Sequence, residues 1–110
     1  MFVMLSSFNL RDGETVETCQ TAIQEFGRHM HQQQMLVSVG PLGMRVANTP
    51  MDTDDDRQLN YYFLSYFESR EQSDHAYKLI QQGVEPSVSI HRAMISKVRD
   101  AVFTCWNEIE

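Results

Sequence analysis

The sequence lacks long apolar runs and clusters of positive charge. No apolar run approaches the ~20 residues that a membrane-spanning helix needs. The first residues, MFVMLSSF, contain no basic leader and no small-residue cleavage site. We therefore expect a soluble, cytoplasmic protein. Lys and Arg number 9 against 15 Asp and Glu, and the formal net charge is -6. Because no basic stripe is present to follow a phosphate backbone, we expect no nucleic-acid partner.

Cysteine is also scarce. Cys19 and Cys105 lie far apart, and neither belongs to a Cys-x-x-Cys or Cys/His spacing. The spacing therefore indicates neither a zinc ribbon nor a redox pair, and we expect two buried, reduced thiols. His29 and His31 supply too few ligands for a metal site. We expect no metal, no cofactor and a single domain over residues 1–110.

Three short segments, in contrast, are apolar on both sides of a period-2 pattern. They are Phe2–Phe8, Leu59–Phe67 and Ala101–Trp106. A sheet built from such strands must be covered on both faces. Helices of the same chain can cover one face, and a second copy of the protein is the expected cover for the other. We therefore predict a homodimer whose interior suits a small, largely apolar ligand.

Two helical regions separate these strands. Asp12 is a plausible N-cap for a first helix, whose apolar stripe is Val16, Cys19, Ile23, Phe26 and Met30. Met35–Ala47 has β-rich ends and reads as one strand bent at Gly40–Gly43. Ser69–Gln72 matches a capping box. The helix that follows stops at Gly83 and Pro86, and a second helical piece begins near Ser87. The predicted order is βαββαβ.

This order resembles the ferredoxin-like dimeric α+β barrel superfamily over nearly the whole chain. The tract NYYFLSYFESREQSDHAY is similar to the third-strand-to-helix junction of that superfamily, and DAVFTCWNEIE is similar to its closing strand. The resemblance implies a four-stranded antiparallel sheet with helices on one face that dimerises through the other. Members include antibiotic-biosynthesis-type and heme-degrading monooxygenases and stress-responsive barrel proteins. Membership thus implies a cleft but no particular reaction.

Alternation along the third strand places Tyr62, Leu64 and Tyr66 on one face. We expect this face to share a ligand-lined interior with residues of the first and last strands: Phe2, Met4, Ser6, Phe8, Val102, Thr104 and Trp106. Buried Tyr and Trp need hydrogen-bond partners, which a cleft supplies. The alternative is that these aromatic side chains simply fill the dimer core.

His91 falls on an apolar helix stripe with Val88, Met94, Ile95 and Val98. A desolvated histidine there can act as an acid or base near pH 7 or as an axial heme ligand. The alternative is a neutral core histidine bonded to a backbone carbonyl. We predict a cleft between sheet and helices for a small apolar or aromatic molecule, with polar contacts from Tyr62, Tyr66, His91 and Trp106.

Two other functions stay open at this point. The resemblance implies a cofactor-independent or heme-linked monooxygenase, for which Asn9, His91 and Trp106 offer the residue types. Such an enzyme needs Asn9 and His91 in one cavity. The other possibility is a structural or regulatory dimer without a ligand.

The polar segment NTPMDTDDDRQ separates two strand-like runs. Asp52, Asp54 and Asp56 match the alternation of a calcium loop, but Arg57 and Phe63 stand where Gly and Glu are required. We therefore expect a solvated hairpin tip. Arg45 interrupts an apolar run, and we expect it to pair with a carboxylate on a neighbouring strand, such as Glu68.

Overall fold

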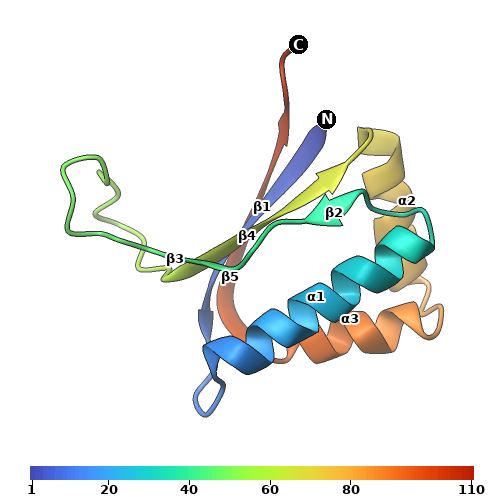
Figure 1. Ribbon diagram of the computed structural model, residues 1–110, viewed down its shortest axis with the longest axis horizontal. Helices are drawn as coiled ribbons and strands as arrows, with labels where there is room; N and C mark the ends of the chain where they lie inside the picture. The colour runs from blue at the N-terminus through green and yellow to red at the C-terminus, as the bar shows by residue number, and fades with distance from the viewer.

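The computed structural model describes residues 1–110 and contains five strands and three helices. Figure 1 shows the elements, which are β1 (Phe2–Leu10), α1 (Val16–Gln32), β2 (Ser38–Val39), β3 (Gly43–Met44), β4 (Tyr61–Phe67), α2 (Arg70–Gln81), α3 (Ser87–Ile95) and β5 (Val98–Asn107). The predicted order is present. The bend expected at Gly40–Gly43 divides the second strand into β2 and β3, so the sheet has five strand segments instead of four.

β1 and β4 form the centre of an antiparallel sheet. The strand order is β2-β4-β1-β5, and β3 also pairs with β4. Ser6 lies opposite Phe63, and Leu5 lies opposite Leu64. Because side chains alternate between the two faces of a strand, Ser6 and Phe63 share one face of the sheet while Leu5 and Leu64 share the other.

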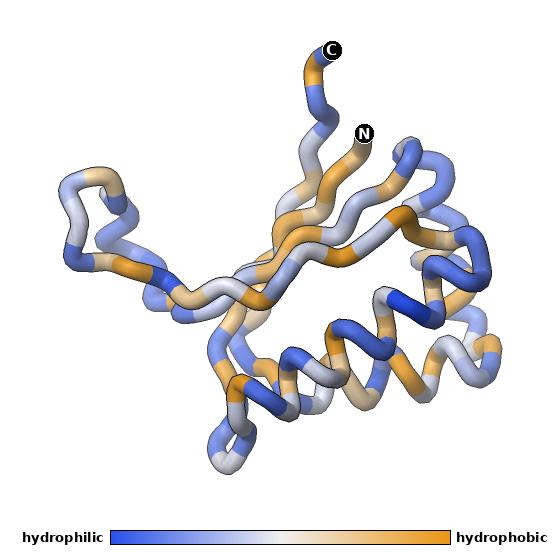
Figure 2. The backbone as a smooth tube through the Cα atoms, viewed as in Figure 1, coloured by the Kyte–Doolittle hydropathy of each residue, from blue (hydrophilic) through white to orange (hydrophobic).

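The three helices cover only one face of this sheet. Figure 1 shows α1, α2 and α3 together on one side, with the opposite side of the strands uncovered. The hydropathy colouring of Figure 2 shows apolar stretches along the strands and alternating polar and apolar positions along α1. We call the uncovered side of the sheet the open face. No helix is both long and apolar enough to cross a membrane.

The core lies between the sheet and the helices. Its larger cluster joins β1, β4, β5, α1 and α3 through Phe8, Cys19, Ala22, Ile23, Phe63, Met94 and Val98. A smaller cluster at the other end joins Met30, Leu36, Phe67 and Ala76. Both clusters are built from one stripe on each helix, as the 3.6-residue period requires.

The N-terminal end of α1 differs from the prediction. Thr15, and not Asp12, is the N-cap, and its hydroxyl accepts a hydrogen bond from the Thr18 backbone N–H. The Thr18 hydroxyl in turn accepts from the Thr15 N–H at 3.2 Å. Asp12 lies in the preceding turn beside Gly13, whose φ of 86° suits glycine. A reciprocal cap of this kind satisfies two helix N–H groups, which a lone Asp12 side chain cannot do.

The two thiols have different environments. Cys19 is fully buried, and burial raises the pKa of its thiol. Cys105 is exposed, which contradicts the expectation of two buried thiols. It lies on the edge strand β5 opposite Met4, on the side of the sheet that carries the helices. The helices do not extend over this part of the edge strand, so the neighbouring Phe103 is also 51% exposed.

Candidate functional site

A cavity lies between the sheet and the helices. It has a volume of about 70 Å³. Its walls come from β1, β4, β5, α1 and α3, and they carry Met4, Ser6, Phe8, Ile23, Phe26, Phe63, Ser65, His91, Met94, Ile95, Val98, Ala101 and Phe103. None of these side chains carries a formal charge when His91 is neutral. The cavity therefore suits an uncharged, mostly apolar occupant.

His91 enters this cavity from α3. Its ring lies 5.5 Å from the ring of Phe26, measured between centroids. Burial lowers the pKa of His91 below its ordinary value of 6.5, and desolvation is the cause that accounts for the shift. The prediction that this histidine is desolvated is confirmed. At neutral pH its imidazole is uncharged, so one ring nitrogen can donate a hydrogen bond and the other can accept one.

Ser6 supplies a second polar group to the cavity. Its side chain is 1% exposed, and its hydroxyl finds no hydrogen-bond partner. A buried polar group left without a partner costs roughly 1–3 kcal/mol, so most such groups are paired in folded proteins. An unpaired hydroxyl at the wall of a cavity is thus a place where a bound molecule gains a hydrogen bond.

The cavity reaches the surface at the β5 edge. Phe103 lines it and is 51% exposed, whereas the wall residues Ser6, Phe8, Phe63 and Ser65 of β1 and β4 are buried. Phe103 pairs with Ser6 in the sheet, so the rim residue and the unpaired hydroxyl are neighbours across the β1–β5 ladder.

The single cleft predicted from the sequence is not formed within one chain. Tyr62 and Tyr66 pair with Ser7 and Val3, and Trp106 pairs with Val3, so all three lie on the open face. His91 lies on the other side of the sheet. The expected grouping of Phe2, Met4, Ser6 and Phe8 with Val102, Thr104 and Trp106 is also wrong. The register places the first set toward the helices and the second set on the open face.

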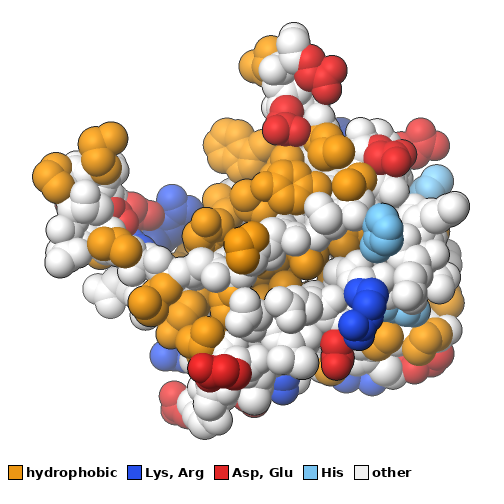
Figure 3. Space-filling model, viewed as in Figure 1, with side chains coloured by type: hydrophobic (Ala, Val, Ile, Leu, Met, Phe, Trp, Pro, Cys, Tyr) orange, Lys and Arg blue, Asp and Glu red, His pale blue; other side chains and the backbone are white.

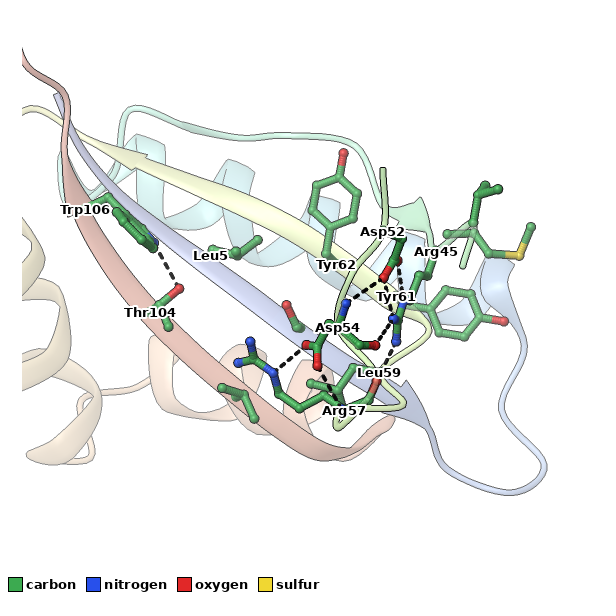
Figure 4. A pocket seen from close by; sticks show the side chains of 14 residues that line it. Leu5, Arg45, Asp52, Asp54, Arg57, Leu59, Tyr61, Tyr62, Thr104 and Trp106 are labelled. Carbon is green, nitrogen blue, oxygen red and sulfur yellow. Dashed lines mark hydrogen bonds and ion pairs between the residues drawn. The ribbon is translucent and has the colours of Figure 1, made fainter. Parts of the chain in front are cut away.

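A second and wider pocket, of about 510 Å³, lies on the open face. Figure 4 shows the open-face residues Leu5, Tyr62, Thr104 and Trp106 on one side of it, and residues of the β3–β4 connection on the other. The indole N–H of Trp106 donates to the Thr104 hydroxyl at 3.0 Å. The Trp106 indole N–H therefore already has a hydrogen-bond partner within its own chain and does not need a ligand to supply one.

We call the β3–β4 connection, residues 45–60, the arm. Arg45, the first residue of the arm, bonds to several of its later residues. Its Nε and Nη2 donate to the two carboxylate oxygens of Asp52, each at 2.8 Å. Nη2 also donates to the Asp54 backbone carbonyl at 2.8 Å. The Arg45 guanidinium holds the pKa of Asp52 below its usual value. The expected pair between Arg45 and a carboxylate is present, but the partner is Asp52 and not Glu68.

Asp54 makes a second set of bonds within the arm. Its carboxylate accepts from the Arg57 backbone N–H at 3.1 Å and from Arg57 Nε at 2.8 Å, and these bonds lower the pKa of Asp54. The Asp56 N–H donates to the same carboxylate. The expected solvated hairpin tip is thus an internally bonded loop, because two of its aspartates neutralise two arginines. No cluster of three metal-ligating side chains is present.

Asn9 does not meet the condition for the monooxygenase. Its side chain donates to the Gln58 carbonyl at 2.9 Å and accepts from the Asn60 N–H at 3.0 Å. It therefore fastens the arm to the end of β1. Asn9 lines a polar surface pocket, whereas His91 lines the cavity between sheet and helices, so the two side chains do not face one cavity.

His29 and His31 have structural contacts. His29 Nε2 lies 2.6 Å from the Ser87 hydroxyl, which joins α1 to the start of α3. His31 Nδ1 lies 2.8 Å from the Val37 carbonyl oxygen. Sequence reasoning missed Phe26, Ser65 and Phe103 as cavity residues. The helical stripe signals Phe26, but only the register shows that Ser65 and Phe103 face it.

Comparison with known proteins supports the fold. No family model and no curated protein matches the sequence. Solved structures do match. At3g17210 from Arabidopsis thaliana superposes with a TM-score of 0.74 at 12% identity, covering 100% of this chain and 97% of that chain.

Two further solved structures with this fold are a protein of unknown function and a hydroxynitrile lyase. A protein of unknown function from Bacteroides fragilis NCTC 9343, described as dimeric and ferredoxin-like, has a TM-score of 0.58 at 12% identity, covering 97% of this chain and 95% of that one. The hydroxynitrile lyase from Passiflora edulis has a TM-score of 0.58 at 12% identity, covering 99% and 95%. At such identity the likeness concerns the fold alone. The chain has a ferredoxin-like α+β fold, as its resemblance to the dimeric barrel superfamily implied.

Proposed function

We propose that the protein is a homodimer that binds a small, uncharged, apolar or aromatic molecule in the cavity between its sheet and helices. The observation that carries the proposal is the unpaired Ser6 hydroxyl in the wall of an otherwise apolar cavity. A ligand with one hydrogen-bonding group and an apolar body fits this lining. It would bury its apolar part against Phe8, Phe26 and Phe63 while pairing its polar group with Ser6.

The charge of the ligand follows from His91. It is the one titratable side chain in the cavity wall, and it is neutral at pH 7 because desolvation lowers its pKa. An anion would find no cation there, and a cation would find no carboxylate. A neutral ligand is therefore favoured.

The size of the ligand follows from the volume. Sites for drug-sized molecules have volumes of roughly 300–1,000 Å³, and an engineered cavity of ~150 Å³ takes benzene. The cavity here, at about 70 Å³, is smaller. A molecule as large as a substituted benzene must displace Phe103 at the rim or leave part of its surface outside.

The dimer part of the proposal rests on the open face. Tyr62, Val102 and Trp106 are exposed there in one chain. An apolar sheet face of this kind requires a cover, and solved structures with this fold are described as dimeric. Tyr62, Tyr66 and Trp106 then lie between the two sheets and not beside His91. They are our candidates for contact with whatever fills that interior.

Thermal unfolding in the presence of small probes tests the ligand site. Phenol is neutral and carries one hydroxyl; toluene has the same apolar body without it, and benzoate carries a charge. A ligand that binds only the folded state raises the melting temperature, and the shift grows with the ratio of its concentration to its dissociation constant. We expect millimolar phenol to stabilise the protein more than toluene, and benzoate to have no specific effect.

Matched variants locate the effect of phenol. Ser6→Ala removes the hydroxyl and should reduce the phenol shift to that of toluene. Ala101→Leu fills the cavity and should abolish both shifts. Tyr62→Phe, on the open face, should leave both unchanged. Equal shifts for all three probes, or a phenol shift that persists in both cavity variants, would contradict the site and favour a structural dimer without a ligand.

A further inference from the structure

Residues 45–60, the arm, project from the body of the molecule on the side of the open face (Figure 1). We propose that the arm is a preformed clasp for a second copy of this chain, which it contacts through Val46 and Met51 together with the adjoining Met44 of β3. This inference rests on the proposed dimer and adds the element that closes it.

The first argument is the internal bonding of the arm. Arg45 and Asp52 are only 20% and 21% exposed, although they lie in a projecting loop. Arg45 bonds to Asp52, Asp54 and the Arg57 carbonyl, and Asp54 bonds to Arg57. The polar groups thus bond to one another across the base of the loop. Ordering a flexible loop on binding costs backbone entropy, and a loop that is already ordered avoids that loss when it binds.

The second argument is what the arm exposes. Met51 is 88% exposed at its far part, and Met44 and Val46 are 69% and 63% exposed at its base. Figure 3 shows hydrophobic side chains on the projecting loop and, beside it, a hydrophobic area over the strands. Arg45 and Asp52 are mostly covered, whereas these three apolar side chains lie in solvent. Exposed apolar side chains on a loop held by internal bonds are the expected pattern of a contact surface.

The third argument is continuity with the open face. One pocket of about 510 Å³ is lined by Met44 and Val46 together with Leu5, Val102 and Trp106 from the sheet. The arm therefore forms one wall of the open face, and a body that covers the face also contacts the arm. Solved structures with this fold are described as dimeric, so the occupant we assign is a second copy.

Two-fold symmetry then makes the contact reciprocal. In such a dimer the same patch is used on both copies, so each arm reaches its partner while the partner's arm reaches back. The half-open pocket beside Trp106 becomes an enclosed space between two chains. If a small molecule covered the pocket in place of a second chain, Met51 would stay exposed to solvent.

Sedimentation velocity over a dilution series measures the dimer dissociation constant. Val46→Asp and Met51→Asp each place a charge on the proposed contact, and we expect each to weaken the dimer at least tenfold. Thr53→Asp places the same charge at an exposed polar position of the arm, and we expect less than a threefold change. Circular dichroism would check that the three variants remain folded.

The open-face variant Val102→Asp separates this inference from the proposed function. If Val102→Asp dissociates the dimer while Val46→Asp and Met51→Asp do not, the arm inference is overturned and the dimer remains. If the wild-type protein is monomeric, both are overturned, whereas the phenol experiment still tests the cavity. Limited proteolysis gives a second readout: the arm should be protected at concentrations above the dissociation constant and cleaved after dilution.

Discussion

His91 combines two properties at the scale of single residues: it lines a cavity, and it is neutral at pH 7. Its lowered pKa has a consequence for stability. Below a pH of about 6.5, the ordinary histidine value, the unfolded chain takes up a proton at this side chain that the folded protein does not. Folding is therefore opposed by protonation in this range, and the contribution of His91 to stability falls as the pH decreases from 7.

We predict that His91→Asn makes stability less dependent on pH. The free energy of unfolding, from urea titrations at pH 7.5 and 5.5, should fall more in the wild type than in the variant. His75 is exposed on α2 and serves as the control, so His75→Asn should keep the wild-type difference. An unchanged pH dependence in His91→Asn would show that the ring is not desolvated in solution.

Some residue-level features of the site could be predicted from the sequence. The apolar stripe around His91 is a local pattern with a 3.6-residue period, and it correctly placed this histidine against the core. The grouping of Ser6 with Val102 and Trp106 failed for a physical reason. β1, β4 and β5 are apolar on both faces, so their alternation does not say which face of one strand joins which face of the next. The register of Ser6 opposite Phe63 and Phe103 decides it.

At the scale of elements, α1 meets β2 through a glycine. A Cβ added to Gly27 would lie 2.5 Å from Val39 Cγ2, closer than packed atoms allow. Val39 is β-branched and stiff, so it cannot move aside cheaply. The small size of Gly27 is what lets the helix lie this near the edge of the sheet.

We therefore expect Gly27→Ala to destabilise the protein by about 1–3 kcal/mol, the usual range for overpacking, although alanine favours a helix over glycine. Val39→Ala should relieve the clash, so the double variant should be more stable than the sum of the two single effects predicts. Chemical denaturation of the four proteins measures this coupling. Additive effects would mean that Gly27 and Val39 do not touch.

Element boundaries were predicted less well than element types. Local signals predicted the helices, the bend at Gly40–Gly43 and the Ser69 cap. The Ser69 hydroxyl does accept a hydrogen bond from the Gln72 backbone N–H. Asp12 and Thr15 both suit an N-cap, and the reciprocal bond with Thr18 decides between them. Arg45 pairs with Asp52 and not with Glu68 because the arm folds back on itself. The polar composition of the segment does not specify that conformation.

At the scale of the whole molecule, the two-sided apolar strands predicted a sheet that needs a cover on each face. The fold confirms half of this argument: the three helices cover one face and leave the other open (Figure 1). The second cover lies outside a single chain. The projection of the arm toward that side was not foreseeable, since charge and turn residues predict a loop but not its direction.

The most direct test of the account is the mass of the native assembly, measured by native mass spectrometry at micromolar concentration. The chain mass is 12.8 kDa. We expect the wild-type protein to have twice that mass, and Val102→Asp to have the mass of one chain with its phenol response intact. A wild-type protein that is monomeric under these conditions would contradict the claim that a second copy covers the open face.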